Sequence, residues 1–191
     1  MRKIIVYIAT SADGYIARSD GDVSWLDRPR PKGNYGMAPF YKSVDTVILG
    51  RKTYDIALEF GHESYPGKKN YIFSRTRRRS RASNVEFVRG AVGDFARQLR
   101  NIKGKNIWLV GGGGLIAEFL DAEQIDEFII HVIPIFIGEG IPLIQPRHRS
   151  VRLALLSSRA YPDGVVRLHY SVLPLTPREN MRQTSTGKER A

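Results

Sequence analysis

Four consecutive glycines, Gly111–Gly114, are the most specific chemical feature of this chain. They follow a short apolar run and precede a segment with helical spacing. In one frame, Gly112, Gly114 and Ala117 fit the dinucleotide fingerprint G-x-G-x-x-G/A, which requires a strand before it and a helix after it. Backbone N–H groups at a helix N-terminus approach a phosphate most closely where no Cβ atoms intervene. The run therefore favours an anion-binding turn, and tight packing against a neighbouring strand is the alternative.

A second candidate anion site follows the apolar stretch DTVILG. Gly50 ends that stretch, and Arg51, Lys52 and Thr53 fall in the first turn of a predicted helix. Cations are unfavourable at a helix N-terminus unless an anion shares the site, and an arginine with a threonine hydroxyl makes a good phosphate pair. Lys52 also fits a solvated helix start. Because Asp45 stands where a P-loop needs its leading glycine, a nucleoside triphosphatase is not supported.

A cluster of arginines follows the short strand predicted at NYIF, in the stretch FSRTRRRSR. Ligands of α/β sheets bind at the carboxyl ends of parallel strands, so the cluster can contribute to a ligand site, although such clusters are usually solvated. With a net charge of +11, it also raises the alternative of a nucleic-acid-binding module. No aromatic residues interleave with Arg77–Arg81 and no recognition helix is evident, so we consider nucleic acid an unlikely partner.

The composition narrows the possible chemistry. The chain has 191 residues, 42% of them hydrophobic, which suits one domain with one core. Cysteine is absent and the four histidines lack ligand spacing, so we expect no disulfide, no catalytic thiol and no metal site. Redox chemistry would therefore need a borrowed cofactor. The apolar run near the N-terminus is too short to span a membrane, so a soluble, cytoplasmic protein is expected.

Predicted strands and helices alternate through most of the chain. Strands are expected at 3–9, 45–50, 70–73, 85–88 and 107–110, and helices at 37–44, 51–60, 91–102 and from the glycines to about Asp121. The last third predicts a strand, a long loop and a hairpin that turns at Tyr161–Gly164. We expect an α/β fold whose mixed sheet of about eight strands is mostly parallel and ends in an antiparallel hairpin. Residues 1–173 form the predicted domain, and residues 174–191 a disordered basic tail.

Six segments, in this order, resemble a known family. They are TSADGYIA, DVSWL, VILGRKTYD, YIFSRT, WLVGGGGLIAEFL and IDEFIIHVIPIFIGEGIPLI. From about Lys3 to Leu173 the chain resembles the dihydrofolate reductase superfamily, and within it the reductase domains of riboflavin biosynthesis and their small stand-alone relatives. Each segment alone is weak, but their order and spacing are specific. The resemblance implies a three-layer α/β sandwich that binds NADPH.

The resemblance also implies a role for each matching residue. The cofactor phosphates would be held at Gly50, Arg51 and Thr53, with Arg51 near the adenosine 2′-phosphate. Ser74, Arg75 and Thr76 would flank the adenosine ribose. The pyrophosphate would lie over Gly111, Gly112, Gly113, Gly114 and Leu115. Ala9 and Ile16 would lie beside the nicotinamide.

The substrate side matches the family less closely. Dihydrofolate reductases carry a carboxylate on their first helix, a few residues after a tryptophan. Here Trp25 is present, but the carboxylate after it, Asp27, precedes a stretch rich in proline and glycine, and neither Met37 nor Phe40 is ionisable. Asp13 is the best-placed ionisable group for binding substrate or supplying a proton. A plain Asp-Gly turn residue is the alternative for Asp13.

The expected activity is that of an NADPH-dependent reductase that transfers hydride to a C=N or C=O carbon of a heterocyclic or ribosylated small molecule. By resemblance, the leading substrate is 5-amino-6-(5-phosphoribosylamino)uracil. A dihydrofolate or pterin reductase is an alternative, as is a binding protein that has lost turnover. The apolar segment 131–144 is too hydrophobic for an ordinary exposed loop, so it must fold onto its own core or meet a partner. The corresponding strands of the riboflavin-type relatives face a second subunit, so the resemblance implies a homodimer that uses this last third of the chain.

Overall fold

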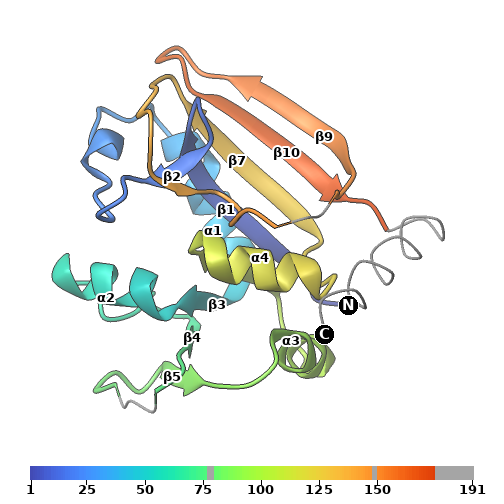
Figure 1. Cartoon of the computed structure of the whole chain (residues 1–191). Coiled ribbons are helices and arrows are strands. Elements are labelled where there is room, and N and C mark those ends of the chain that lie inside the picture. Colours follow the sequence, from blue (N-terminus) through green and yellow to red (C-terminus); the bar gives the residue numbers. More distant parts are fainter. Residues whose placement is uncertain (77–79, 148–149, 175–191) are drawn as a thin grey trace.

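The computed structural model describes residues 1–76, 80–147 and 150–174. Within them an eight-stranded sheet runs through the middle of the molecule (Figure 1), in the order β5-β4-β3-β6-β1-β7-β10-β9. All neighbours from β5 to β7 are parallel, whereas β10 is antiparallel to both β7 and β9. The strands are β1 (Ile4–Ser11), β3 (Val44–Gly50), β4 (Lys69–Phe73), β5 (Val85–Val88), β6 (Asn106–Gly111), β7 (Glu127–Ile133), β9 (Leu153–Ala160) and β10 (Val166–Val172). The predicted mixed sheet is therefore confirmed.

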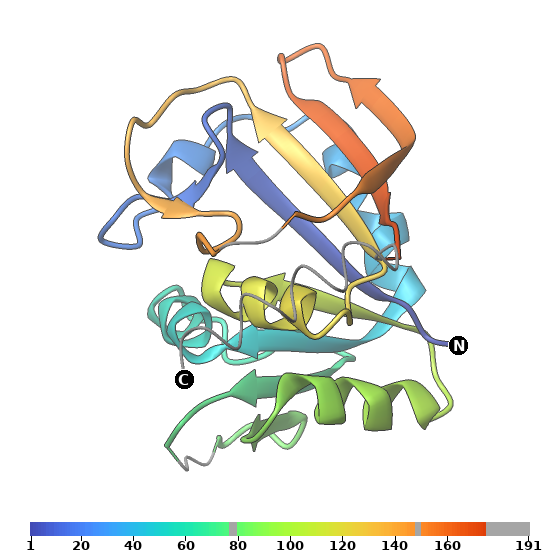
Figure 2. The same cartoon turned by 45° about the vertical axis from the view of Figure 1, so that its right-hand side comes forward.

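Helices cover both faces of this sheet, which makes three layers (Figure 2). On one face, α3 (Val92–Asn101) and α4 (Gly113–Asp121) pack against the inward side chains of β1, β3 and β6. On the other face lie α1 (Met37–Ser43) and α2 (Arg51–Glu59), which contribute Phe40 and Tyr54 to a second apolar cluster. Because both faces are covered, the central strands read as almost continuous apolar runs, as parallel strands usually do.

Smaller elements complete the fold. Two 3-10 helices, Ser24–Leu26 and Asn34–Gly36, lie in the long connection between β2 (Tyr15–Ala17) and α1. The strand β2 pairs with β8 (Ile141–Pro142) in a separate two-stranded sheet. The predicted hairpin turn at Tyr161–Gly164 is confirmed, since the Gly164 amide donates to the Tyr161 carbonyl at 3.0 Å.

One helix boundary differs from the expectation. The spacing placed Ile102 on the buried face of the helix at 91–102, but α3 ends at Asn101 and Ile102 is its C-cap, with 55% of the residue exposed. The extended backbone of Ile102 turns its side chain away from the helical face. Of the remaining expectations, the cluster members Arg77–Arg79 and the tail from 175 onward lie outside the described residues.

The parallel strands bring the predicted motifs to one edge of the sheet. The strands β3 and β6 are neighbours, with Leu49 opposite Gly111, and β3 and β4 are neighbours, with Gly50 opposite Phe73. Strand β1 pairs with β6 on one side and β7 on the other. The carboxyl ends of β1, β3, β4 and β6 therefore adjoin, which is where parallel α/β sheets bind ligands. No helix within the described ranges is long and apolar enough to cross a membrane.

Candidate functional site

Two helix N-termini meet at the carboxyl edge of the sheet. Gly50 is the N-cap of α2 and Gly112 is the N-cap of α4, and no side chain caps either helix in the described structure. They are close neighbours, since a Cβ atom on Gly50 would lie 3.6 Å from the Gly112 nitrogen. The first N–H groups of a helix have no partner within the helix, and they carry its positive dipole end. This edge therefore offers two adjacent sets of amide donors suited to linked phosphates.

Strand β2, through Ile16, forms a third side of this site. A Cβ atom on Gly112 would lie 3.3 Å from Thr53 Oγ1 and 3.9 Å from Ile16 Cδ1. Three segments that are far apart in sequence thus converge at the bare backbone of Gly112. Its φ of −77° is one that any residue adopts, so the absence of a side chain matters there for space rather than for backbone conformation.

The other glycines of the run have different surroundings. A Cβ atom on Gly113 would lie 2.3 Å from the Pro142 carbonyl oxygen, closer than the backbone could tolerate. Gly114 faces Gln145, whose side-chain oxygen would lie 3.2 Å from such an atom. Gly111 has φ of +126°, a region that favours glycine, and its peptide bond to Gly112 is cis. At Gly113 the contacts are those of tight packing against a neighbouring strand, whereas Gly112 lies beside Thr53 and Ile16 at the candidate site.

Arg51 begins α2 and is held against its own helix. Its Nε donates to both carboxylate oxygens of Asp55, at 2.7 and 2.8 Å, in an i,i+4 ion pair. Within the described structure the two Nη groups make no further hydrogen bond, so they remain available to a ligand. The predicted neighbours after β4 are also placed. Ser74 is nearly buried and donates to the Thr76 carbonyl at 2.9 Å, while Arg75 is exposed.

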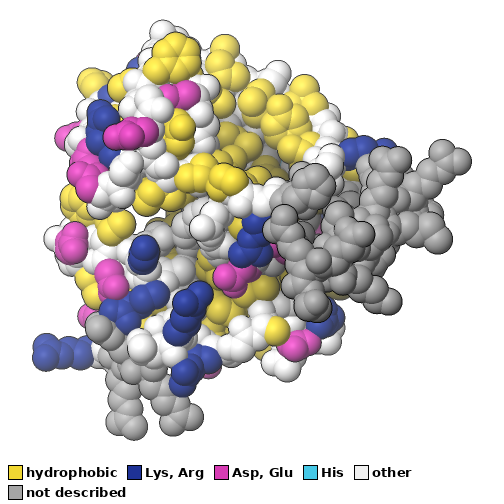
Figure 3. Space-filling view, in the orientation of Figure 1, with side chains coloured by type: hydrophobic (Ala, Val, Ile, Leu, Met, Phe, Trp, Pro, Cys, Tyr) yellow, Lys and Arg dark blue, Asp and Glu magenta, His cyan; other side chains and the backbone are white. Residues whose placement is uncertain are grey.

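Basic side chains gather on this side of the molecule. In the space-filling view, several Lys and Arg side chains lie over α2 and the neighbouring ends of β4 and β5 (Figure 3). Positive charge over a pair of helix N-termini raises the local concentration of a polyanion.

Asp13 lies in the turn between β1 and β2, where it holds two loops together. Its carboxylate accepts hydrogen bonds from the Ser11 hydroxyl and from the Ile137 and Gly138 amides, the last two at 3.1 and 2.8 Å. The Ser11 hydrogen bond and then these backbone amides lower the pKa of Asp13. The carboxylate is therefore ionised at neutral pH, which makes it a poor proton donor and a good anchor.

Trp25, the other residue predicted for the substrate side, lies in the 3-10 helix Ser24–Leu26. Its indole Nε1 is buried and has no hydrogen-bond partner among the described residues. A buried donor without a partner is costly, so Trp25 retains an N–H that a ligand or water could satisfy.

A polar cluster that the sequence analysis missed lies on the face covered by α1 and α2. The Tyr35 carbonyl oxygen is 3.3 Å from Tyr7 Oη, 3.1 Å from Tyr161 Oη and 3.4 Å from His131 Nε2. His131 is 3% exposed, and burial lowers its pKa, so the imidazole is neutral at neutral pH. Burial raises the pKa of Tyr7 to about 12. A histidine in the middle of the apolar run FIIHVI was the available signal.

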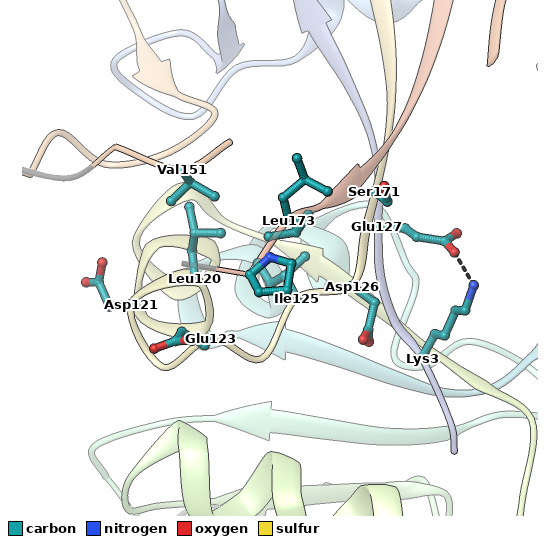
Figure 4. Close-up of a pocket in the computed structure, with 12 residues that line it drawn as sticks. Lys3, Leu120, Asp121, Glu123, Ile125, Asp126, Glu127, Val151, Ser171 and Leu173 are labelled. Atoms are coloured by element: carbon teal, nitrogen blue, oxygen red, sulfur yellow. Dashed lines mark hydrogen bonds and ion pairs between the residues drawn. The ribbon is translucent and has the colours of Figure 1, made fainter. Parts of the chain in front are cut away.

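On the same face of the sheet, a cavity of about 330 Å³ lies between α1, α2 and the segment after α2. It is lined by Tyr41, Leu49, Tyr54, Ala57, His62, Glu63, Ser64, Tyr65, Pro66 and Asn70. Its size and aromatic walls are typical of sites for small organic molecules. A second cavity, of about 360 Å³, lies at the opposite edge of the sheet, where Lys3 pairs with Glu127 (Figure 4). It lies away from the glycines and from α2, so it is not part of the candidate site.

Comparison with known proteins identifies the family of this chain. Residues 2–167 match the family model of the RibD C-terminal domain. The chain is 39% identical over 170 residues to YwjB of Bacillus subtilis, and the alignment covers 88% of this chain and 97% of that protein. It is 31% identical to a protein of Shewanella sp. PV-4 described as a riboflavin biosynthesis protein. That structure has a TM-score of 0.80 and covers 90% of this chain and 99% of its own.

The fold is shared more widely than the sequence. Dihydrofolate reductase from Enterococcus faecalis, solved in complex with NADP(H), superposes with a TM-score of 0.66 at 13% identity, over 90% of this chain and 97% of the reductase. This confirms the predicted dihydrofolate reductase-like sandwich. A family model that spans nearly the whole chain, together with relatives above 30% identity along their full length, shows that this protein belongs to the RibD C-terminal domain family.

Proposed function

We propose that this protein is an NADPH-dependent reductase. The observation that carries the proposal is the convergence of Thr53, Ile16 and the bare Gly112 beside two uncapped helix N-termini. Membership of the RibD C-terminal domain family and the likeness to an NADP(H)-bound dihydrofolate reductase fold support the same cofactor. A cytoplasmic location, where NADPH is made and used, is part of this proposal.

Different groups of residues would bind different parts of the cofactor. The amides of the first turns of α2 and α4 would hold the phosphates, with the Thr53 hydroxyl between them. Arg51, oriented by Asp55, would bind the 2′-phosphate, and the segment Ser74–Thr76 would flank the adenosine ribose. Ala9 and Ile16 would form the apolar wall of the nicotinamide. When bound, the cofactor supplies the hydride, and the chain's part is to orient the two rings and exclude water.

The substrate would be a heterocyclic or ribosylated small molecule that lies over α1 and α2, with its reducible C=N or C=O carbon near Ala9. The compound 5-amino-6-(5-phosphoribosylamino)uracil is the leading candidate because of the family. Dihydrofolate and pterins are less well supported, because helix α1, with the sequence MAPFYKS, carries no carboxylate. Trp25 and the Asp13 turn would border the substrate, and the geometry of Asp13 favours an ordering role over proton transfer.

Titration with NADPH and NADH, followed by intrinsic fluorescence, tests this function directly. Saturable binding of NADPH, tighter than binding of NADH, is the expected result. A panel of pterins and pyrimidine ribotides, assayed by loss of nicotinamide absorbance, then identifies the substrate. Absence of NADPH binding by folded protein would refute the proposal, and NADPH binding without turnover across the panel would favour a binding protein.

We further propose a homodimer, formed through a different surface from the expected one. Most of the segment 131–144 packs onto its own chain, where Leu143 and Ile144 contact the core, and Phe136 is its one large exposed hydrophobic residue, at 78%. The edge strand β9 instead exposes Leu153, Leu155 and Leu156. An apolar edge strand is a natural site for pairing with a second copy.

A further inference from the structure

A row of residues across the sheet connects Ala9, which is predicted to lie beside the nicotinamide, with Arg167, an arginine that has no role in the proposed cofactor site. In the sheet, Ala9 of β1 pairs with His131 of β7, His131 pairs with Arg167 of β10, and Arg167 pairs with Arg159 of β9. Residues directly opposite each other on adjacent strands project to the same face, here the face of α1 and α2. Strands are spaced by about 4.8 Å, so Arg167 begins about 10 Å from Ala9.

The side chain of Arg167 is partly buried, and part of its guanidinium is shielded from solvent. Its Nε is buried and has no hydrogen-bond partner among the described residues, and its Nη1 would lie 3.2 Å from a Cβ atom on Gly36. No ion pair joins Arg167 to a carboxylate in the described structure. Asp163, in the hairpin turn before β10, pairs with Arg28 and accepts the Tyr35 hydroxyl.

The surroundings of Arg167 supply neutral donors rather than an anion. Burial favours the uncharged forms of both His131 and Tyr7, because it lowers the pKa of His131 and raises that of Tyr7. The positive charge of Arg167 lowers the pKa of both groups, so both lie within its electrostatic range. This charge acts in the same direction as burial at His131 and in the opposite direction at Tyr7. Arginine stays protonated at all physiological pH values. A partly buried, unpaired cation is costly, and proteins retain such a group where a ligand completes the pair.

We propose that Arg167 binds an oxyanion of the substrate, a carboxylate or a phosphate, and so selects for an acidic substituent about two strand spacings from the reducible carbon. The planar fork of arginine suits either group bidentately. His131 lies between Ala9 and Arg167 in this row. It would therefore contact and orient the substrate ring, which would lie between the nicotinamide and the oxyanion. This inference rests on the proposed function, because the position of the nicotinamide near Ala9 orients the substrate.

Arg159 provides a matched control. It has the same charge and is the partner of Arg167 in the β9–β10 pair, but it is exposed and its guanidinium lies over the Tyr161 ring at 5.0 Å. Benzoate and inorganic phosphate serve as probes of the two oxyanions. Their binding to the NADPH complex is measured by calorimetry, with the imidazole NMR signal of His131 as a second readout.

One probe should bind wild-type protein and Arg159→Gln saturably, shift the His131 signal, and bind Arg167→Gln about tenfold or more weakly, as expected for a lost charge-assisted contact. Preference for benzoate would assign a carboxylate, and preference for phosphate a phosphate ester. Arg167→Lys, which keeps the charge, is expected to lose part of the affinity and serves if the glutamine variant does not fold. Equal affinities across the variants, or no saturable binding to wild type, would overturn the inference.

NADPH affinity should be the same in all variants. If wild type failed to bind NADPH but apo protein still bound the probe through Arg167, the proposed function would fail while the oxyanion site remained.

Discussion

The backbone of Gly112 faces the hydroxyl of Thr53 across the candidate cofactor site, so closely that a single added methyl group would lie 3.3 Å from Thr53 Oγ1. One residue further along the chain, a methyl group would lie 2.3 Å from the Pro142 carbonyl oxygen. Neighbouring glycines thus serve different ends, since Gly112 leaves space at the ligand edge and Gly113 allows two backbone segments to touch.

This difference predicts that alanine at Gly112 changes cofactor binding, whereas alanine at Gly113 changes stability. Gly112→Ala should weaken NADPH binding about tenfold or more, with a melting temperature close to that of wild type, because its φ suits any residue. Gly113→Ala should lower the melting temperature by several degrees, because the segment 141–144 must move, at a cost of about 1–3 kcal/mol. Calorimetry and thermal melts compare the two variants. Normal NADPH binding by Gly112→Ala would show that the cofactor phosphates lie elsewhere.

Arg51 is predicted to determine the preference for NADPH over NADH. Arg51→Ala should weaken NADPH by about 1.5–3 kcal/mol, roughly ten- to a hundredfold, and leave NADH nearly unchanged, because only NADPH carries the 2′-phosphate. Lys52→Ala removes the same charge from the same helical turn, at an exposed position, and is the control. Similar losses for both nucleotides in Arg51→Ala would indicate general electrostatics instead of a specific contact. Asp55→Asn should weaken NADPH less, since it frees the arginine without removing it.

Asp13 is expected to order the site rather than donate a proton. Asp13→Asn keeps one acceptor oxygen for the Ile137 and Gly138 amides, so it should retain measurable turnover with a raised KM. The pH dependence of kcat should keep its shape, because a carboxylate with a lowered pKa is already ionised across the neutral range. Complete loss of kcat in this variant, with intact NADPH binding, would instead restore the proton-transfer role.

Glu127 should make the protein less stable in acid. Burial alone would raise its pKa, but hydrogen bonds from Lys3 and His169 outweigh burial and lower it below the usual 4.5. A group whose pKa is lower in the folded state stabilises the fold above its unfolded pKa, and the stabilisation is lost as pH falls through the folded value. Glu127→Gln should therefore cost about 1–3 kcal/mol at neutral pH, with the difference from wild type shrinking below about pH 4.5. Denaturant unfolding of both proteins at several pH values measures this, and a difference that did not change with pH would contradict it.

The proposed dimer depends on the edge strand β9. Replacing Leu155 and Leu156, which are 57% and 52% exposed, by glutamate should convert a dimer to a monomer without unfolding it. Phe136→Glu, in the apolar segment 131–144, is the comparison. Light scattering reports the masses, and a chain that ends at Pro174 should still dimerise. A monomeric wild type at micromolar concentration would remove this part of the proposal.

Much of the fold was predictable because local pattern and tertiary structure agree. The apolar runs at DTVILG and NIWLVG are buried on both faces, so their lack of alternation identified parallel strands. The glycines and the basic first turn of α2 identified the ends of two such strands. Boundaries were less certain, as Ile102 shows, because a side chain at the last position of a helical pattern follows whichever way the backbone leaves.

The sequence by itself determined the order of the strands and helices along the chain, the edge of the sheet where we propose that the cofactor binds, and the residue types that suit a phosphate-rich cofactor. Only the tertiary structure decided that Gly112 lies beside Thr53 and Ile16, that Asp13 anchors a loop, and that Arg167 lies near His131 and Tyr7 with no carboxylate paired to it among the described residues. The physical reason is that strand periodicity and turn chemistry are local properties of the chain. The contact of Tyr161 with Tyr35 joins residues 126 positions apart, and the close approach of Gly113 to Pro142 also joins distant segments, so both depend on how the whole chain folds.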